Sequence, residues 1–293
     1  MEAICTEKLT KFYGKVRGIQ DLDLSVEEGD FFGFIGPNGA GKSTTIRSLL
    51  GLIRPSAGQA AVFGLDISRE KETILRRVGY LPAEASFYPG MRVRELLKLS
   101  ADLRRQSCAK EAAILCERLQ LDPERRVEEL SFGNRKKAAI VCALQSKPEL
   151  LILDEPTGGL DPLMQREFFN ILRERNREGA TVFLSSHVLS EIQRNCERAA
   201  VIRGGAIIAC DSVKALARAN AKRVSLRGSV NLHGLEGILD LQSSEDHVSF
   251  LYSGEMGALL ARLSSGSLSD LNIAEPDLEE IFLHFYEKGE AAS

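Results

Sequence analysis

The sequence predicts an α/β protein in which helices cover both faces of a parallel sheet, followed by a smaller α+β domain. Three observations support this prediction. Apolar runs of strand length alternate with longer helical patterns over the first two thirds of the chain. A glycine-rich segment near residue 40 joins one such run to a helical pattern. After about residue 215 the composition shifts, and short alternating strands follow. We therefore place a first domain at residues 1–215 and a second at 220–293.

Apolar spacing and turn residues give the elements of the first domain. Residues 22–26 alternate as a half-buried strand does, and residues 31–35 form an apolar run between turn signals. The other predicted strands are 150–153 and 181–184, and the predicted helices are 43–53, 93–105, 110–121, a helix after 133 that stops before Pro148, 163–178, and one that starts at 188. Residues from about 86 to 147 are helix-rich and charged, so we expect a helical subdomain there.

The second domain has weaker signals. Residues 223–226 alternate, and residues 239–242 and 248–252 flank a Ser-Ser-Glu-Asp turn, which predicts an antiparallel hairpin. A final helix is expected after Pro276, with Asp277 as N-cap and Glu280 placed for a capping box. No site is recognisable in this domain. A structural or dimer-supporting role and regulation by a partner both stay open.

Composition excludes several classes of function. The chain has 293 residues, 44% hydrophobic, with a formal net charge of −3, which argues against a protein that coats nucleic acid. Its six cysteines include no CxxC pair, so we expect reduced thiols and no zinc or redox motif. The N-terminus does not resemble a secretory signal, and no apolar run reaches the ~20 residues that span a bilayer. We expect no direct insertion into a bilayer.

The glycine-rich segment matches a phosphate-binding motif. It reads Gly36, Pro37, Asn38, Gly39, Ala40, Gly41, Lys42, Ser43 and Thr44, which fits GxxxxGK[ST] between a predicted strand and a predicted helix. Glycines allow backbone N–H groups to turn inward around phosphates. Lys42 would reach the β- and γ-phosphates, and the Ser43 hydroxyl would bind Mg²⁺. The alternative is a glycine-rich turn with an exposed lysine.

Polar residues end two further predicted strands. Asp154 and Glu155 follow the apolar run at 150–153, at the sheet edge where ligands bind. Asp154 would hold Mg²⁺, and Glu155 would orient or deprotonate an attacking water. The serines at 185–186 and His187 follow the run at 181–184 and suit contacts to a terminal phosphate. A solvated strand end and a structural histidine are the alternatives.

The segment Leu130-Ser131-Phe132-Gly133-Asn134-Arg135-Lys136-Lys137 places three cations at the start of a helix. The positive end of a helix macrodipole disfavours cations and favours anions. The segment could be a nucleic-acid patch, a solvated helix end or a phosphate-docking site. We favour phosphate docking by Ser131, Gly133 and the first helical N–H groups, with the three cations splayed into solvent. No aromatic residues or wider basic stripe support a nucleic-acid surface.

Taken together, these motifs resemble the ATP-binding subunits of ABC transporters. The matching segments occur in that family's order: Tyr13, GPNGAGKST at 36–44, LSFGN at 130–134, LLILDEPT at 150–157, GGLD at 158–161 and SSH at 185–187. The resemblance covers the first 215 residues, and EPDLEEIF at 275–282 resembles the tail of bacterial multidrug or antibiotic exporter ATPases. It implies a P-loop NTPase fold with a RecA-like core, an antiparallel β subdomain and a helical subdomain.

The resemblance also implies a mechanism. Two ATPase subunits, here expected to form a homodimer, sandwich ATP and Mg²⁺ and drive an integral membrane permease from the cytoplasmic face, in the direction of export. Lys42, Glu155 and His187 would be catalytic on one side of the nucleotide. Ser131 and Gly133 of the other subunit would bind its γ-phosphate. Asp161 would line the dimer interface, and Tyr13 would stack on adenine unless it is a core aromatic.

The chain departs from the family pattern at two places. Phe132 and Asn134 replace the second glycine and the glutamine of LSGGQ. Ala83 stands where family members usually carry a glutamine after Leu-Pro, and Glu84 could substitute only after a one-residue shift. These departures leave open a nucleotide-binding regulator with weak hydrolysis. A soluble ATPase acting on ribosomes or DNA is a further alternative, although the chain has neither two ATPase units nor a long coiled coil.

Overall fold

Three strands made mostly of apolar residues form the centre of the main sheet. These are β3 (Phe31–Ile35), β7 (Leu150–Asp154) and β8 (Thr181–Ser186), and every residue in them is buried. They pair in parallel, and β6 (Val78–Leu81), β9 (Arg198–Arg203) and β10 (Ala206–Ser212) complete the order β10-β9-β3-β8-β7-β6. Strands buried on both faces require cover on both faces. The predicted parallel sheet is confirmed.

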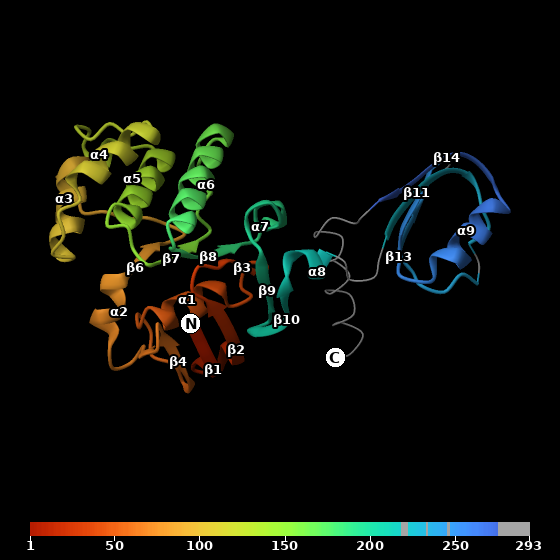
Figure 1. Cartoon of the computed structure of the whole chain (residues 1–293), viewed down its shortest axis with the longest axis horizontal. Coiled ribbons are helices and arrows are strands. Elements are labelled where there is room, and N and C mark those ends of the chain that lie inside the picture. The colour runs from red at the N-terminus through yellow and green to blue at the C-terminus, as the bar shows by residue number, and fades with distance from the viewer. Residues whose placement is uncertain (218–221, 233, 245–246, 275–293) are drawn as a thin grey trace. The chain divides into compact units, whose positions relative to one another are not determined.

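The computed structural model describes residues 1–217, 222–232, 234–244 and 247–274 (Figure 1). Its internal contacts divide the chain into two units, Met1–Asp211 and Ser212–Ser293. The parallel sheet and all the motifs quoted above, apart from the C-terminal EPDLEEIF, belong to the first unit.

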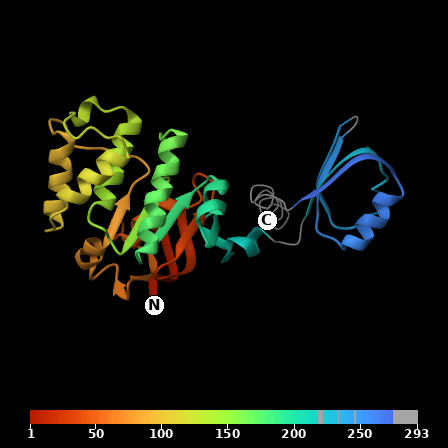
Figure 2. The same cartoon turned by 45° about the horizontal axis from the view of Figure 1, so that its top comes forward.

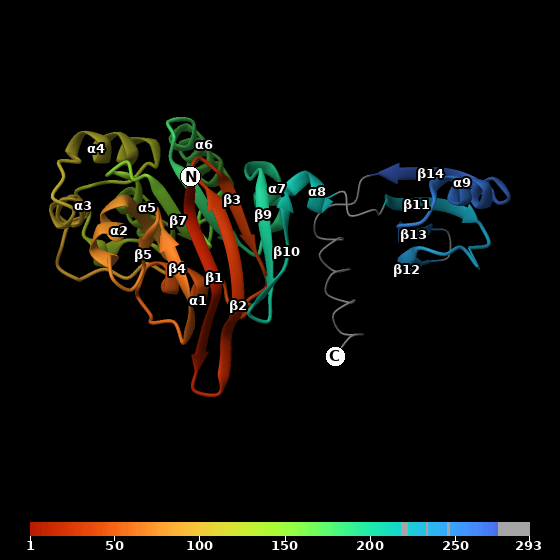
Figure 3. The ribbon, with the colours of Figure 1, turned by 60° about the horizontal axis from the view of Figure 1, so that its bottom comes forward.

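A second sheet of the first unit is antiparallel. Its strands are β1 (Glu2–Tyr13), β2 (Val16–Glu27), β4 (Ala57–Val62) and β5 (Leu65–Asp66), in the order β2-β1-β4-β5. Figure 3 shows the long hairpin of β1 and β2. Helix α1 (Lys42–Leu49) packs against both sheets, because its Ile46 and Leu49 share one buried cluster with Phe34 of β3 and Val62 of β4. The phosphate-binding motif therefore leads into a helix that is held on two sides.

Five further helices of the first unit lie close to their predicted positions. They are α3 (Val93–Leu103), α4 (Ala109–Arg118), α5 (Phe132–Leu144), α6 (Pro162–Arg177) and α7 (Leu189–Asn195). Helix α2 (Lys71–Arg77) and the 3₁₀ turn η1 (Val127–Glu129) were not predicted. Figures 1 and 2 show α3, α4 and α5 gathered at one end of the unit. The helix predicted over 43–53 ends at Leu49, because Gly51 adopts φ +60°.

The second unit is an antiparallel sheet with one helix packed on it. After α8 (Val213–Ala217), the elements are β11 (Lys222–Ser229), β12 (Ile238–Ser243), β13 (His247–Tyr252), α9 (Met256–Ser264) and β14 (Ser267–Ala274), with strand order β12-β13-β11-β14. Phe250 of β13 and Leu259 of α9 lie in its core. The predicted hairpin is present as β12 and β13. The helix predicted after Pro276 lies outside the described residues.

The main sheet should depend strongly on Phe183. Its fully buried ring stacks on Phe32 at a centroid distance of 6.0 Å and lies 5.3 Å from Phe34. We expect Phe183→Ala to lower the free energy of unfolding by about 3–5 kcal/mol, as truncation of a buried aromatic does. Leu103→Ala, at a side chain 77% exposed, is the control and should change it by less than about 0.5 kcal/mol. Urea unfolding of the two variants measures both values, and equal shifts would contradict the packing described.

Candidate active site

The glycine-rich loop between β3 and α1 is pressed against neighbouring backbone. Gly41 caps α1 with φ 110°, and a Cβ there would lie 2.8 Å from the carbonyl oxygen of Gly18. A Cβ at Gly36 would lie 2.5 Å from the carbonyl oxygen of Ile202. Both positions therefore require glycine. The loop is thus close-packed and has glycine where a side chain would not fit, a form that lets backbone N–H groups surround a phosphate.

Lys42 reaches back into this loop. Its ammonium is buried and donates to the carbonyl oxygens of Gly36, at 2.5 Å, and Pro37, at 3.2 Å. It also lies 3.0 Å from Oε1 of Glu155. That ion pair lacks hydrogen-bond geometry, so the buried Oε1 has no hydrogen-bond partner among the described residues. Lys42 and the loop are therefore suited to an anionic ligand, which would accept a charge-assisted hydrogen bond from the ammonium.

Two carboxylates lie at the end of β7, and that of Glu155 contacts Lys42. Asp154 is 1% exposed, and its Oδ1 accepts a hydrogen bond from the Ser185 hydroxyl at 2.7 Å. Glu155 has φ +46°, and its N–H donates to the carbonyl oxygen of Ser185 at 3.1 Å. The His187 ring Nδ1 lies 2.7 Å from Glu155 Oε2. Lys42, Glu155 and His187 therefore form one continuous charged and polar cluster, as the sequence predicts.

The two serines that end β8 have hydrogen-bond partners inside the protein. Ser185 and Ser186 are both fully buried. Ser185 orients Asp154, its register partner on β7, and the Ser186 hydroxyl donates to Glu191 at 2.8 Å. Buried hydroxyls need internal partners, and here the neighbouring strand and α7 supply them.

The residues available for Mg²⁺ fit that ion. Mg²⁺ prefers oxygen ligands and is commonly bound by one or two protein groups together with substrate phosphates. The Ser43 hydroxyl, half-buried, has no hydrogen-bond partner in the described part of the chain. Asp154 supplies a carboxylate at the adjoining strand end. Among the described residues there is no cluster of three or more His, Cys, Asp or Glu side chains that could hold a metal without such a substrate.

The LSFGN segment forms the N-terminus of α5. Ser131 is the N-cap, exposed, and its hydroxyl accepts from the N–H of Asn134 at 3.3 Å. A Cβ at Gly133 would lie 2.6 Å from the carbonyl oxygen of Gly159, and one at Gly159, where φ is +82°, would lie 2.3 Å from the Phe132 ring. The unusual Phe132 therefore covers a glycine of the GGLD loop in the same chain. Among the described residues, no hydrogen bond or ion pair joins this segment to the phosphate-binding loop of its own chain.

Comparison with known proteins identifies the family. Residues 19–158 match the family described as ABC transporter. The chain is 35% identical to the bacitracin transport ATP-binding protein BcrA of Bacillus licheniformis, over 96% of this chain and 96% of that protein. The chain belongs to the ABC transporter ATP-binding proteins. As a member of this family it is an ATP-binding protein and an ATPase.

Two further comparisons agree with this membership. The chain is 34% identical to the daunorubicin/doxorubicin resistance ATP-binding protein DrrA of Streptomyces peucetius, over 94% of this chain and 82% of that protein. Among solved structures, an ATP-binding subunit of an ABC transporter superposes with a TM-score of 0.70 at 29% identity, covering 74% of this chain and 92% of its own. The predicted P-loop NTPase fold with its antiparallel and helical subdomains is confirmed.

The expectation that all three cations at the start of α5 splay into solvent is wrong. We call α5 the signature helix, because the LSFGN segment, or signature, forms its N-terminus. Arg135 is exposed, but Lys136 is 2% exposed and its ammonium donates to three backbone carbonyl oxygens. Burial lowers the pKa of Lys136 to about 8, an effect that the nearby carboxylates of Asp154 and Glu155 oppose. The sequence carried no signal for this, because three adjacent cations at a helix start normally remain in water.

Tyr13 lies beside the phosphate-binding loop and is no core residue. Its side chain is 46% exposed, with the Lys11 ammonium 5.3 Å from the ring centroid. A Cβ at Gly18 would lie 3.0 Å from Tyr13 Cε2, and the same glycine contacts Gly41. The alternative of a buried aromatic is therefore contradicted, and the ring is available for stacking.

Two other candidate residues have local partners. Asp161 is the exposed N-cap of α6, and its Oδ1 accepts from the N–H of Met164 at 3.0 Å. Ala83 contributes only a backbone carbonyl, which accepts from Lys136 at 2.9 Å. Glu84 is exposed and makes no hydrogen bond or ion pair within the described part of the chain. No hydrogen bond or ion pair within the described residues therefore holds Glu84 at the position of the missing glutamine.

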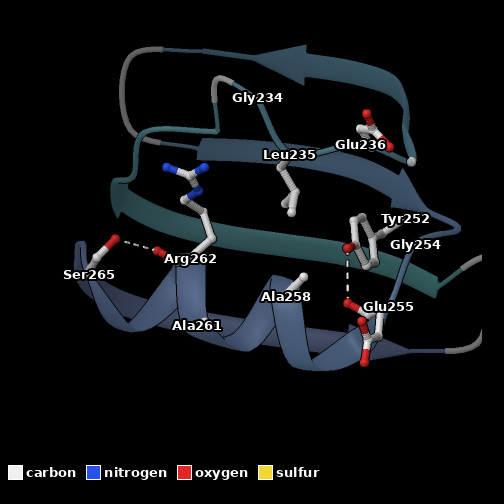
Figure 4. Close-up of a pocket in the computed structure, with 11 residues that line it drawn as sticks. Gly234, Leu235, Glu236, Tyr252, Gly254, Glu255, Ala258, Ala261, Arg262 and Ser265 are labelled. Atoms are coloured by element: carbon white, nitrogen blue, oxygen red, sulfur yellow. Dashed lines mark hydrogen bonds between the residues drawn. The ribbon is translucent and has the colours of Figure 1, made fainter.

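Two cavities lie away from these residues. One, of about 870 Å³, lies between α3 and α4 and is lined mainly by apolar atoms. The other, of about 790 Å³, lies in the second unit between α9 and residues 234–237 (Figure 4). In Figure 4 Arg262 rises from α9 beside Leu235, while the Tyr252 hydroxyl donates to the Glu255 carbonyl oxygen at 3.0 Å. Neither cavity contains a predicted site residue.

The loop geometry predicts the effect of one added methyl group. Gly41→Ala should reduce ATP affinity at least tenfold, because its Cβ would collide with the Gly18 carbonyl and displace the loop, whereas strain from φ alone costs only about 1–2 kcal/mol. Gly29→Ala is the matched control, since Gly29 also has a positive φ, of 83°, but nothing lies within 4 Å of its added Cβ. Titration with a fluorescent ATP analogue measures both. Equal affinities for the two variants would contradict the close packing of the loop.

Proposed function

We propose that this chain is the ATP-hydrolysing subunit that powers a separate integral membrane permease from the cytoplasmic face of the membrane, in the direction of export. The observation that carries the proposal is the cluster of Lys42, Glu155 and His187 beside the glycine loop. The direction is supported by two relatives whose names refer to bacitracin transport and to daunorubicin/doxorubicin resistance. In the described part of the chain, no helix is both long and apolar enough for a membrane span.

Each residue of the cluster has a separate role in hydrolysis. The backbone N–H groups of residues 36–44 and Lys42 bind the β- and γ-phosphates, and Tyr13 stacks on adenine. Ser43 and Asp154 are the ligands for Mg²⁺, which neutralises phosphate charge when bound. Glu155 accepts the proton of the water that attacks the γ-phosphorus, and the bond to the β–γ bridging oxygen breaks.

His187 supports Glu155 in this step. Its Nδ1, 2.7 Å from Glu155 Oε2, holds one carboxylate oxygen, and its exposed ring can contact the γ-phosphate. Oε1 has no hydrogen-bond partner among the described residues, which leaves it able to accept a hydrogen bond from water. When a phosphate group of the nucleotide pairs with Lys42, the ion pair between Lys42 and Glu155, 3.0 Å long here, is released.

The site is completed by a second copy of the chain. Ser131 is exposed at the N-terminus of α5, where backbone N–H groups and the helix macrodipole favour an anion. Within the described part of its own chain, the Ser131 side chain bonds only to the helix that it caps. We therefore place Ser131 and Gly133 of one subunit on the γ-phosphate bound by the other, with Asp161 at the interface between them.

Glu155→Gln tests the catalytic assignment. The amide keeps the shape of the carboxylate but accepts no proton, so ATP should remain bound while turnover falls by roughly 10²–10⁴-fold, the usual contribution of a general base. Glu72→Gln makes the same chemical change at an exposed carboxylate on α2, outside the cluster, and should retain the parent rate. Phosphate release measures turnover for both variants. Undiminished hydrolysis by the Glu155 variant would rule out this mechanism.

Ser131→Arg tests the two-subunit site. A bulky side chain at the cap should block approach of the second subunit, and so prevent ATP-dependent dimerisation and hydrolysis, while one chain still binds ATP within about twofold. Ser68→Arg, at another exposed serine, controls for added charge. Size-exclusion chromatography with ATP, in the Glu155→Gln background, reports the dimer. Persistence of hydrolysis in the Ser131 variant would show that the signature does not act on nucleotide.

A further inference from the structure

Lys136 is a buried cation whose ammonium, among the described residues, hydrogen-bonds only to backbone oxygens. It lies in the first two turns of α5 and is 2% exposed. Its Nζ donates to the carbonyl oxygens of Pro82 at 3.1 Å, Ala83 at 2.9 Å and Glu155 at 3.0 Å. These bonds use all three donors of an ammonium group. A buried ammonium whose donors are all used holds its three partners in place, because the loss of any one of them would leave a buried N–H group without a hydrogen bond.

The three carbonyls belong to two adjacent strand ends. Pro82 and Ala83 follow β6, and Glu155 follows β7, its parallel neighbour. Lys136 is provided by α5, the helix that also presents Ser131 at its N-terminus. One side chain therefore connects the signature helix, the segment that carries the unusual Ala83, and the backbone of the proposed proton acceptor.

The contact to Glu155 is made where the backbone is strained. A φ of +46° places this non-glycine residue in the left-handed region, which is unfavourable for a residue with a Cβ. The N–H before the strained Cα is held by the Ser185 carbonyl at 3.1 Å, and the C=O after it is held by Lys136 at 3.0 Å. With both sides held, the side chain is directed at Lys42 and His187. Strain of this kind persists only where surrounding contacts fix it.

Charge also favours this arrangement. Among the described residues the Lys136 ammonium makes no ion pair, yet the carboxylates of Asp154 and Glu155 are near enough to raise its pKa against the effect of burial. The cation thereby offsets part of the repulsion between two neighbouring carboxylates.

We propose that Lys136 is a positioning residue for ATP hydrolysis. It fixes the backbone of Glu155 in the left-handed conformation that aims the carboxylate, and it holds that backbone to the Pro82–Ala83 segment and to α5. Movement of the signature helix is thereby transmitted to the proton acceptor through one side chain. The inference rests on the proposed role of Glu155. It also accounts for how Ala83, without a polar side chain, is joined to the site, namely through its carbonyl oxygen.

The test compares Lys136→Met and Lys136→Gln with a matched control in the full chain. Met removes all three donors, and Gln keeps two on a shorter side chain. Arg104→Met is the control, because the Arg104 guanidinium also donates to backbone carbonyls, those of Leu75 at 3.2 Å and Val78 at 2.8 Å. Val78 begins β6, at the opposite end of that strand from Pro82 and Ala83.

We expect kcat of Lys136→Met to fall roughly 10- to 100-fold, the loss typical of a catalytic group misplaced by about 1 Å. The affinity for ATP should stay within twofold of the parent, and Lys136→Gln should recover part of the rate. Arg104→Met should lower the thermal midpoint while leaving kcat unchanged at temperatures where it is folded. A parental kcat in either Lys136 variant, or equal losses in the Lys136 and Arg104 variants, would overturn the proposal.

A double-mutant cycle with Glu155→Gln shows whether Lys136 acts through Glu155. Single-turnover hydrolysis, with enzyme in excess, measures the slow rates. Lys136→Met should cost little further rate in the Glu155→Gln background, since groups that act as a unit are non-additive. The same fold-loss in both backgrounds would overturn the inference. If Glu155→Gln alone hydrolyses at the parental rate, the proposed function fails instead, whatever the Lys136 variants do.

Discussion

The active site depends on the parallel pairing of strands that are buried on both faces. In β3, β8 and β7 the register sets Ile35 beside Ser186, and Asp154 beside Ser185. Because parallel neighbours end at the same edge, residues far apart in sequence emerge together there. The phosphate-binding loop follows one of these strands, the two carboxylates follow another, and His187 follows the third. The short distances within the cluster are consequences of this alignment.

The active site also depends on the balance of positive and negative charges buried at this edge of the sheet. Lys42, Asp154 and Lys136 are almost fully buried, and Glu155 lies among them. Burying so many charges is costly unless each is paired or hydrogen-bonded. Here one ammonium faces the Glu155 carboxylate, and the other binds the carbonyl of the same residue. Glu155 is consequently held from both ends, while one of its oxygens has no hydrogen-bond partner among the described residues.

The signature helix is joined to this edge by packing and by hydrogen bonds. Phe132 lies over Gly159, and Gly133 lies against the Gly159 carbonyl, so the start of α5 and the GGLD loop fit together within one chain. Lys136 adds a polar connection one turn further along. A second subunit that engages Ser131 would therefore act on a helix already linked to Glu155. This arrangement gives a physical route by which dimer closure could affect hydrolysis.

The sequence by itself determined the chemistry and most of the central fold. Its ordered motifs identified the loop at 36–44, the carboxylates at 154 and 155, and His187, because these depend on residue types at fixed local spacing. Periodicity located the buried strands and the long helices, since it reports burial along one element. Only the tertiary structure decided that Ser185 binds Asp154 and that Lys136 binds three carbonyls. Those partners lie on other elements, and which elements become neighbours is set by long-range pairing that local spacing does not encode.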